Sequence, residues 1–259
     1  MRLEQATVLS HTAAGSLYRV LDLRAPLTAA EARPGQFVHV QIPNLQGSLL
    51  RRPFSLYAAG DATLRILYKV VGTGTRALTV LRPGQEVSLL GPLGNGFPMD
   101  RPSGVPALVA GGYGVAPLCF LARRLPTKGV VFIGGASADH ILCADEFRAL
   151  GWDVRVTTED GSAGVRGLVT AAMDAWTAER GGGAGVELYA CGPDGMLKAV
   201  ATRAASLGVQ AWLSMDRHMG CGAGVCLACV QRIRRDGREQ WIRVCKDGPV
   251  LDAREIVWK

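Results

Sequence analysis

The chain has 259 residues, which is enough for two or three compact domains, and a composition of 48% hydrophobic residues with 33 glycines is that of a globular protein rich in turns. The net charge of +7 is scattered along the chain without helix-turn-helix or zinc-finger spacing, which argues against a nucleic-acid partner. Glycines and a proline interrupt the longest apolar stretch, residues 105–122, so we expect no membrane-spanning helix. No signal peptide or lipid anchor is indicated, and the expected location is the cytoplasm.

Short segments with β-branched and alternating apolar residues, separated by turns, occupy the first hundred residues. Strands are predicted at residues 6–9, 18–23, 36–42, 63–70 and 86–89. This pattern predicts a small antiparallel β-barrel.

Two segments within the predicted barrel suggest an anion site. A basic and aromatic segment, residues 51–57, follows a strand, and a glycine-rich turn ends another strand and opens a short helical segment at residues 76–81. Backbone amides at the start of a helix can receive a diphosphate, and Arg52 placed opposite would complete the site. By itself, the 51–57 segment is equally compatible with a simple strand edge.

After a linker-like stretch at residues 101–104, apolar runs alternate with helical segments. Strands are predicted at residues 107–110, 130–134, 153–157 and 187–190, and helices at 117–125, 144–150, 168–178 and 195–207. Such an alternation predicts a doubly wound, parallel α/β sheet.

Two loops of this sheet are candidates for binding a dinucleotide. The first contains Gly111, Gly112 and Gly114 between a strand and a helix, with Pro117 suited to the first helical position, but it lacks the third glycine of the usual fingerprint. The second is the run Cys191, Gly192 and Pro193, which closes a later strand. Ligands of open α/β sheets bind at the carboxyl edge, so two loops there favour a nicotinamide site over two tight turns.

The most specific signal is a group of four cysteines near the end of the chain: Cys221, Cys226, Cys229 and Cys245. The intervening stretches of four, two and fifteen residues match the plant-type [2Fe–2S] spacing. The nearby Gly220, Gly222 and Gly224 remove Cβ atoms that would keep the backbone from the sulfides. Structural zinc is the alternative, although zinc sites usually use paired short spacings.

Two strand-like runs, residues 229–234 and 239–244, flank Asp236 and Gly237, a pair suited to a type I′ hairpin that would return Cys245 to the other cysteines. Five arginines lie on or beside this hairpin: Arg232, Arg234, Arg235, Arg238 and Arg243. They would either raise the potential of a negatively charged cluster and engage an acidic partner, or keep an edge hairpin solvated. Cys119 is expected to pack in the core, and Cys143 gives no signal.

Taken together, these residues resemble the ferredoxin-reductase-like flavoprotein superfamily, and with the four cysteines the chain resembles the electron-transfer subunits of class 1B dihydroorotate dehydrogenases over nearly its whole length. The ending at residues 245–250 and the run at residues 219–222 match that family. Two departures are Phe54, where the wider superfamily often has Tyr, and Asp216, where Glu is common.

The resemblance implies an FAD-binding β-barrel at residues 1–100, an NAD-binding α/β domain at 101–210 and a small [2Fe–2S] domain at 211–259. It implies FAD contacts from Arg52, Pro53, Phe54, Ser55, Leu67, Tyr68, Lys69, Gly74 and Thr75. The two glycine-containing loops would line the NAD(H) side, and the four cysteines would hold the cluster.

The implied function is an electron relay. A flavin can accept two electrons as hydride and release them singly to a one-electron cluster. The expected partner is an FMN-containing dihydroorotate dehydrogenase catalytic subunit, two copies of each forming a heterotetramer, with electrons passing through the cluster and FAD to NAD⁺. No residue is predicted to act as a general base on dihydroorotate. The rivals are a related NAD(P)H:acceptor reductase subunit, of the ferredoxin:NADP oxidoreductase or sulfhydrogenase type, and a non-catalytic zinc-binding interaction module.

Overall fold

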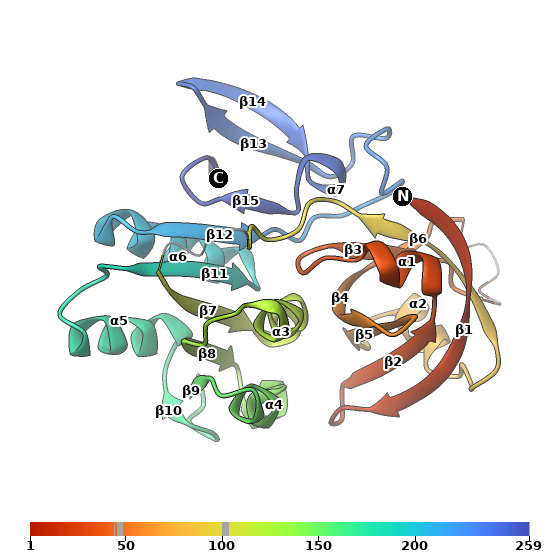
Figure 1. The fold of residues 1–259 in the computed structure, drawn as a ribbon, viewed down its shortest axis with the longest axis horizontal. Coiled ribbons are helices and arrows are strands. Elements are labelled where there is room, and N and C mark those ends of the chain that lie inside the picture. Colours follow the sequence, from red (N-terminus) through yellow and green to blue (C-terminus); the bar gives the residue numbers. More distant parts are fainter. Residues whose placement is uncertain (44, 46–48, 100–103, 259) are drawn as a thin grey trace.

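The computed structural model describes residues 1–43, 45, 49–99 and 104–258. A β-barrel and a parallel sheet lie side by side, and a β-hairpin near the C-terminus lies above the sheet, with the segments flanking it at the junction (Figure 1).

The barrel is closed by six antiparallel strands, as the alternating pattern of the first hundred residues predicted. Their order is β1 (Arg2–Ala13), β2 (Tyr18–Arg24), β5 (Thr63–Lys69), β4 (Arg52–Gly60), β3 (Phe37–Val40) and β6 (Glu86–Leu93). Strand β4 was not among the predicted strands, because an arginine and a proline open it. The helices are α1 (Pro26–Glu31), which was not predicted, and α2 (Thr73–Leu78), which begins three residues before the predicted segment.

The second layer is a seven-stranded sheet in which the strand order reverses between β7 and β11. The order is β10 (Val165–Arg166), β9 (Asp153–Thr158), β8 (Val130–Gly135), β7 (Val105–Gly111), β11 (Val186–Cys191), β12 (Gln210–Ser214) and β15 (Val250–Asp252). All pairings are parallel except that of β12 with β15. The predicted parallel sheet is confirmed, and β10, β12 and β15 extend it beyond the four predicted strands.

Helices cover both faces of this sheet. Helices α3 (Val115–Arg124) and α4 (Ala144–Ala149) pack on one face, and α5 (Val169–Glu179) and α6 (Asp194–Leu207) pack on the other. Helix α3 begins at Val115, so Pro117 occupies the third helical position and the prediction of the first position was wrong. The first four amides of a helix have no intrahelical acceptor, so a proline is still tolerated there.

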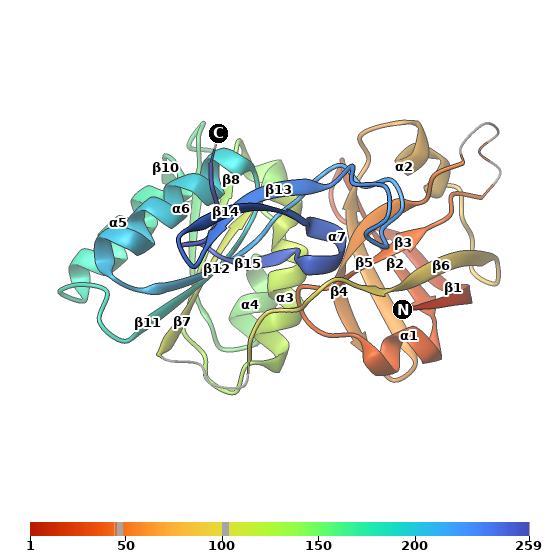
Figure 2. The same ribbon diagram turned by 90° about the horizontal axis from the view of Figure 1, so that it is seen from above.

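Helix α3 also joins the sheet to the barrel (Figure 2). Its Phe120 is fully buried among barrel side chains. From the barrel, Tyr18, Tyr57 and Leu67 are buried in the same core cluster as the α3-covered face of the sheet. The two units therefore share an apolar interface, which fixes the loops of the sheet relative to the barrel wall.

The C-terminal segment forms β13 (Val230–Arg235), β14 (Arg238–Arg243) and α7 (Val244–Asp247) before it returns to the sheet as β15. Asp236 and Gly237 have φ values of 52° and 73°, as a type I′ turn requires, so the hairpin prediction is confirmed.

The expected domain boundary between residues 210 and 211 falls inside β12. The boundary between residues 100 and 101, and all of the expected linker except Gly104, lie outside the described residues. No helix in the described part of the chain is long and apolar enough to cross a membrane.

Candidate cofactor sites

The two glycine-containing loops of the sheet are in contact with each other. They follow β7 and β11, which are parallel neighbours with Ala110 opposite Cys191. A Cβ on Gly114 would lie 2.3 Å from the carbonyl oxygen of Cys191, and a Cβ on Gly192 would lie 3.1 Å from the Cα of Gly111. Only glycine permits this approach. The contact lies at the carboxyl ends of two strands where the strand order reverses, the usual ligand position in such sheets.

Tyr113, which the sequence reasoning did not single out, lies in the first loop. Its hydroxyl donates a hydrogen bond of 3.2 Å to Oδ2 of Asp216. Burial, and then the Asp216 carboxylate, raise the pKa of Tyr113 to about 12, so the hydroxyl stays protonated at neutral pH. Burial likewise raises the pKa of the Cys191 thiol to about 12, so this thiol is uncharged at neutral pH.

Strands β4 and β5 carry most of the residues assigned to FAD. Because side chains alternate along a strand, some of these residues point into the barrel and others point out of it. Phe54 and Tyr68 are buried inside the barrel with ring centroids 5.6 Å apart, so only their backbone can reach a cofactor outside. The alternation places four others on the outer face: Pro53, Ser55, Leu67 and Lys69. This outer face is the one turned toward the sheet, since Leu67 packs in the shared interface.

Tyr18 of β2 links this outer face to the first glycine loop. The ammonium group of Lys69 lies 5.7 Å from the centroid of the Tyr18 ring. The hydroxyl of Tyr18 lies 4.0 Å from the position of a Cβ on Gly112. The residues assigned to flavin and those assigned to nicotinamide therefore face each other across one buried tyrosine.

Arg52 lies beside the first turn of α2. Its Nε is 3.5 Å from the position of a Cβ on Gly74. The hydroxyl of Thr75 accepts hydrogen bonds from the amides of Val71 and Gly72 and donates one to the carbonyl of Gly72. The side chain of Thr75 thus shapes the turn, while Arg52 supplies positive charge next to it.

The four cysteines of the C-terminal segment form two pairs. The amide of Cys221 lies 3.4 Å from Sγ of Cys226, and the amide of Cys245 lies 3.4 Å from Sγ of Cys229. Cys229 and Cys245 are buried, Cys221 is half-buried and Cys226 is exposed. Among the described residues, no group of three or more His, Cys, Asp or Glu side chains has the arrangement of a site for one metal ion. Two pairs of thiols match a cluster in which each of two irons takes two cysteines.

Backbone amides surround the sulfur of Cys221. Those of Ala223, Val225 and Cys226 lie 3.3–3.4 Å from it. Burial alone would raise the pKa of Cys221, but these amides lower it to about 6. The loop is thus prepared to hold a thiolate, the form in which cysteine binds iron.

His39 of β3 packs against this loop. Its imidazole is fully buried, and neither ring nitrogen has a hydrogen-bond partner among the described residues. A Cβ on Gly222 would lie only 2.9–3.0 Å from its ring atoms. Burial, and then Arg51, lower the pKa of His39 to about 4, so the ring is neutral. In the sequence, His39 gave no signal because it is one of four consecutive buried strand residues.

The hairpin arginines are largely paired. Arg232 and Arg234 both contact Glu239, and Arg235 contacts Glu255. Arg243 binds Asp247 and donates a hydrogen bond of 3.3 Å to the carbonyl of Gly224, which ties α7 to the cysteine loop. These ion pairs favour a structural role for the four arginines over an open basic surface.

Cys119 and Cys143 lie away from the other cysteines. Cys119 is buried in the core of α3, as expected. Cys143 precedes α4 with a left-handed φ of 61°, and its sulfur lies 3.7 Å from the hydroxyl of Tyr57. That hydroxyl bonds to Glu146, which also pairs with Arg123 of α3. These contacts brace the interface between barrel and sheet.

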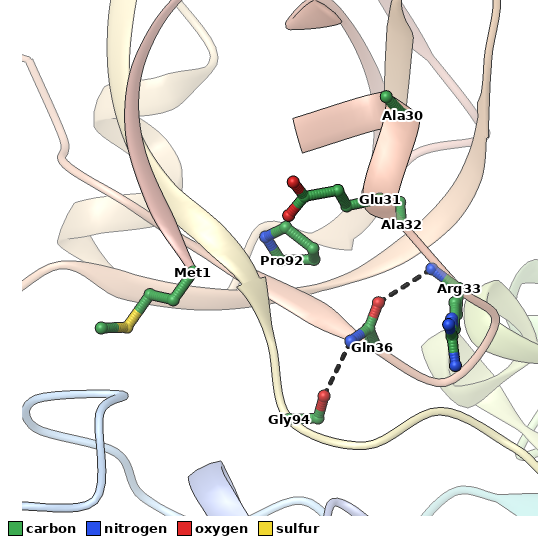
Figure 3. Close-up of a pocket in the computed structure, with 8 residues that line it drawn as sticks. All are labelled: Met1, Ala30, Glu31, Ala32, Arg33, Gln36, Pro92 and Gly94. Carbon is green, nitrogen blue, oxygen red and sulfur yellow. Dashed lines mark hydrogen bonds between the residues drawn. The ribbon is translucent and has the colours of Figure 1, made fainter. Parts of the chain in front are cut away.

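A cavity of about 630 Å³ lies between the end of α1 and the end of β6 (Figure 3). It is lined by Met1, Ala30, Glu31, Ala32, Arg33, Gln36, Pro92 and Gly94. Gln36 is held there by hydrogen bonds with the amide of Arg33 and the carbonyl of Gly94. The residues singled out from the sequence do not line it.

Comparison with known proteins agrees with the two parts of the chain that carry these sites. Residues 216–257 match the family described as the iron-sulfur cluster binding domain of dihydroorotate dehydrogenase B, and residues 108–202 match the oxidoreductase NAD-binding domain. Among solved structures, one of NADH-dependent reduced ferredoxin-NADP oxidoreductase has a TM-score of 0.84 and 30% identity, over 98% of this chain and 90% of that chain. The ferredoxin reductase in carbazole 1,9a-dioxygenase has a TM-score of 0.68 at 20% identity, over 80% of this chain and 66% of that one, and shows the fold alone.

Two relatives cover nearly the whole chain. The dihydroorotate dehydrogenase B (NAD(+)) electron transfer subunit of Bacillus caldolyticus is 40% identical over 98% of both chains. That of Desulforamulus reducens is 36% identical over 92% of both. At this identity and coverage, the chain belongs to the family of dihydroorotate dehydrogenase B (NAD(+)) electron transfer subunits.

Proposed function

We propose that this chain carries electrons between an FMN-containing dihydroorotate dehydrogenase catalytic subunit and NAD⁺, with FAD and a [2Fe–2S] cluster as its own cofactors. One observation supports the order of the relay. The nicotinamide loops meet the outer barrel wall at Tyr18, and the cysteine loop meets the barrel at His39, which is paired with Pro53 of the FAD segment. The three candidate sites are therefore consecutive, as electron transfer over short distances requires.

Each site is supplied by different residues. Arg52 and the backbone at Gly74 would hold the FAD diphosphate, because a guanidinium and helix-start amides both favour phosphate oxygens. The outer faces of Leu67 and Lys69 would border the flavin ring. When bound, FAD would convert between the single electrons that a [2Fe–2S] cluster carries and the electron pair that NAD⁺ takes up as hydride. Cys221 and Cys226 would hold one iron, and Cys229 and Cys245 the other.

The exposed part of the cysteine loop is the proposed contact with the catalytic subunit. Val225 and Leu227, which flank Cys226, are 81% and 60% exposed. Leu227 also has a left-handed φ of 58°, a conformation that residues other than glycine keep only where the surrounding structure holds them in it. Apolar side chains held outward around a cluster ligand suit a protein interface, and we propose that two copies of each subunit assemble there.

Co-expression with the cognate catalytic subunit tests this proposal. We expect one complex whose mass corresponds to two copies of each chain. Replacing Val225 and Leu227 with Asp should weaken the complex, whereas Val165→Asp, a change at a residue 68% exposed on the distant strand β10, should not. A complex that both variants form equally well would contradict the proposed surface.

The rival function has one specific observation in its favour, the TM-score of 0.84 to the NADH-dependent reduced ferredoxin-NADP oxidoreductase. The two proposed functions differ in the protein with which the chain exchanges electrons. Failure to bind the dihydroorotate dehydrogenase subunit, together with NAD(P)H-dependent reduction of ferredoxin in a complex with another subunit, would replace our proposal with this one.

A further inference from the structure

Residues 216–220 form a stem that leads from strand β12 to Cys221, the first cysteine of the loop. Between residues 216 and 228, no backbone amide or carbonyl is hydrogen bonded to the backbone of another described residue. Met219 packs against the core of the sheet. The polar contacts that hold the stem to other described segments come from the side chains of Asp216 and Arg217. The position of the stem therefore depends largely on these two side chains.

The two side chains attach the stem to the two nicotinamide loops. Asp216 accepts the hydrogen bond of Tyr113 in the first loop. Nη1 of Arg217 donates to both carboxylate oxygens of Asp194, at 2.8 and 3.0 Å. Asp194 directly follows Pro193 of the second loop and is the first residue of α6. Two consecutive residues thus tie the stem to both loops.

Arg217 also binds the hairpin strand that follows Cys229. Its Nε and Nη2 donate to Oε1 of Gln231, at 3.1 and 2.8 Å. Gln231 lies on β13, two residues after Cys229, and is only 8% exposed. Its own amide nitrogen donates to the backbone carbonyls of Arg232 and Val257. One guanidinium therefore joins the start of α6 to the hairpin that separates the two buried cysteines.

The two ends of this link differ in burial, so they can be broken separately. The side chain of Asp194 is 59% exposed, and exposed ion pairs contribute only about 0–1 kcal/mol because water replaces the lost partner. Gln231 is buried, and leaving its oxygen without a donor would cost about 1–3 kcal/mol. Loss of the Asp194 carboxylate would therefore cut the tie between hairpin and α6 with little effect on stability. Loss of the Arg217 guanidinium would cut the tie and also destabilise the hairpin.

We propose that Arg217 is a positioning residue that fixes the cysteine segment, residues 221–245, against the nicotinamide loops and so sets the distance between the cluster and the flavin. The inference rests on the proposed function, since it requires both cofactors. Because the nicotinamide loops meet the outer barrel wall at Tyr18, a segment tied to these loops is also placed relative to FAD. Residues that support metal ligands from outside typically alter activity by about 10- to 100-fold when they are replaced.

Flash photoreduction of the bound FAD tests this role without NADH, because absorbance then follows the electron from the flavin to the cluster. We expect this transfer to be about tenfold slower than in the native protein in both Arg217→Met and Asp194→Ala. Arg203→Met is the matched control: the Arg203 guanidinium pairs with both carboxylate oxygens of Asp174, between α5 and α6, and its loss should leave the rate unchanged.

EPR of the chemically reduced protein gives a second readout. The cluster signal should be broader in Arg217→Met and Asp194→Ala than in the native protein, because the cysteine segment would occupy more than one position. Native transfer rates in both variants would overturn the inference. So would slow transfer in Arg217→Met alone, since Arg217 would then only complete the hydrogen bonds of Gln231. A protein that binds FAD but no cluster would instead refute the proposed function, and the inference with it.

Discussion

Arg52 of β4 and Gly74 of α2 lie side by side: Nε of the guanidinium is 3.5 Å from the position of a Cβ on Gly74. Two segments separated along the chain thus bring a cation to the first turn of a helix. A diphosphate suits this arrangement better than a single phosphate does. The start of the helix and the guanidinium can each neutralise part of the charge of a diphosphate.

The first prediction concerns the flavin. Heat-released cofactor should be FAD by mass spectrometry, and Arg52→Ala should weaken FAD binding by about tenfold, the effect of losing one charge-assisted hydrogen bond. Arg235→Ala is the matched control, because that guanidinium pairs with Glu255 on the hairpin. FMN as the only flavin, or equal FAD loss in both variants, would contradict the assignment.

The second prediction concerns the cluster ligands. Cys226→Ser should abolish the brown colour and the EPR signal of the reduced [2Fe–2S] centre but leave FAD bound, because the FAD residues lie on the barrel. Cys143→Ser should preserve both, since Cys143 lies at the start of α4 near Tyr57. Stoichiometric zinc without iron after anaerobic purification would rule out the cluster.

The third prediction concerns the contact between the nicotinamide loops. Gly114→Ala places a Cβ 2.3 Å from the carbonyl oxygen of Cys191, so the loops must separate. We expect a loss of about 1–3 kcal/mol of stability and a higher KM for NADH with an artificial one-electron acceptor. Gly195→Ala in α6, where a Cβ would meet no atom within 4 Å, should leave KM unchanged and should not lower the stability. An unchanged KM in Gly114→Ala would place NADH elsewhere.

The fourth prediction concerns pH. Asp22 accepts hydrogen bonds from Arg65 and Ser10 across adjacent barrel strands. Burial opposes the charge on Asp22, but these bonds outweigh it and lower the pKa of the carboxyl group. Its stabilisation is therefore complete above the pKa of about 4 in the unfolded chain and is lost as pH falls through the lower folded value.

Asp22→Asn should accordingly be about 1 kcal/mol less stable than the native protein at pH 7. The difference should shrink as pH falls below 4, as measured by denaturant unfolding of both proteins. A difference that grew on acidification would show that the carboxylate is not stabilised in the folded state.

The sequence predicted most of the architecture because its signals were local. The Asp236-Gly237 turn and strand alternation each depend on neighbours in the chain, and both predicted the observed structure. Strand β15 could not be predicted in this way: its three residues join the sheet only through pairing with β12, a contact between distant segments. Likewise, α1 is too short for helical periodicity, and Glu4 on β1 accepts hydrogen bonds from its first-turn amides.

The same distinction applies to the sites. The glycine loops were predicted to share one sheet edge, and their contact follows from parallel strands with Ala110 opposite Cys191. The packing of His39 against the cysteine loop had no local signal, because it depends on the approach of Gly222 from the far end of the chain. Tyr113 was missed for a similar reason, since its partner Asp216 follows β12.

The central claim is that this chain relays electrons and does not itself oxidise dihydroorotate. Dihydroorotate-dependent reduction of NAD⁺ should be measured for this chain alone, for the FMN-containing catalytic subunit alone and for their complex. The account predicts activity in the complex only, with the isolated chain still oxidising NADH with artificial one-electron acceptors. Activity of the isolated chain with dihydroorotate, or an inactive complex that contains FMN, FAD and the cluster, would contradict it.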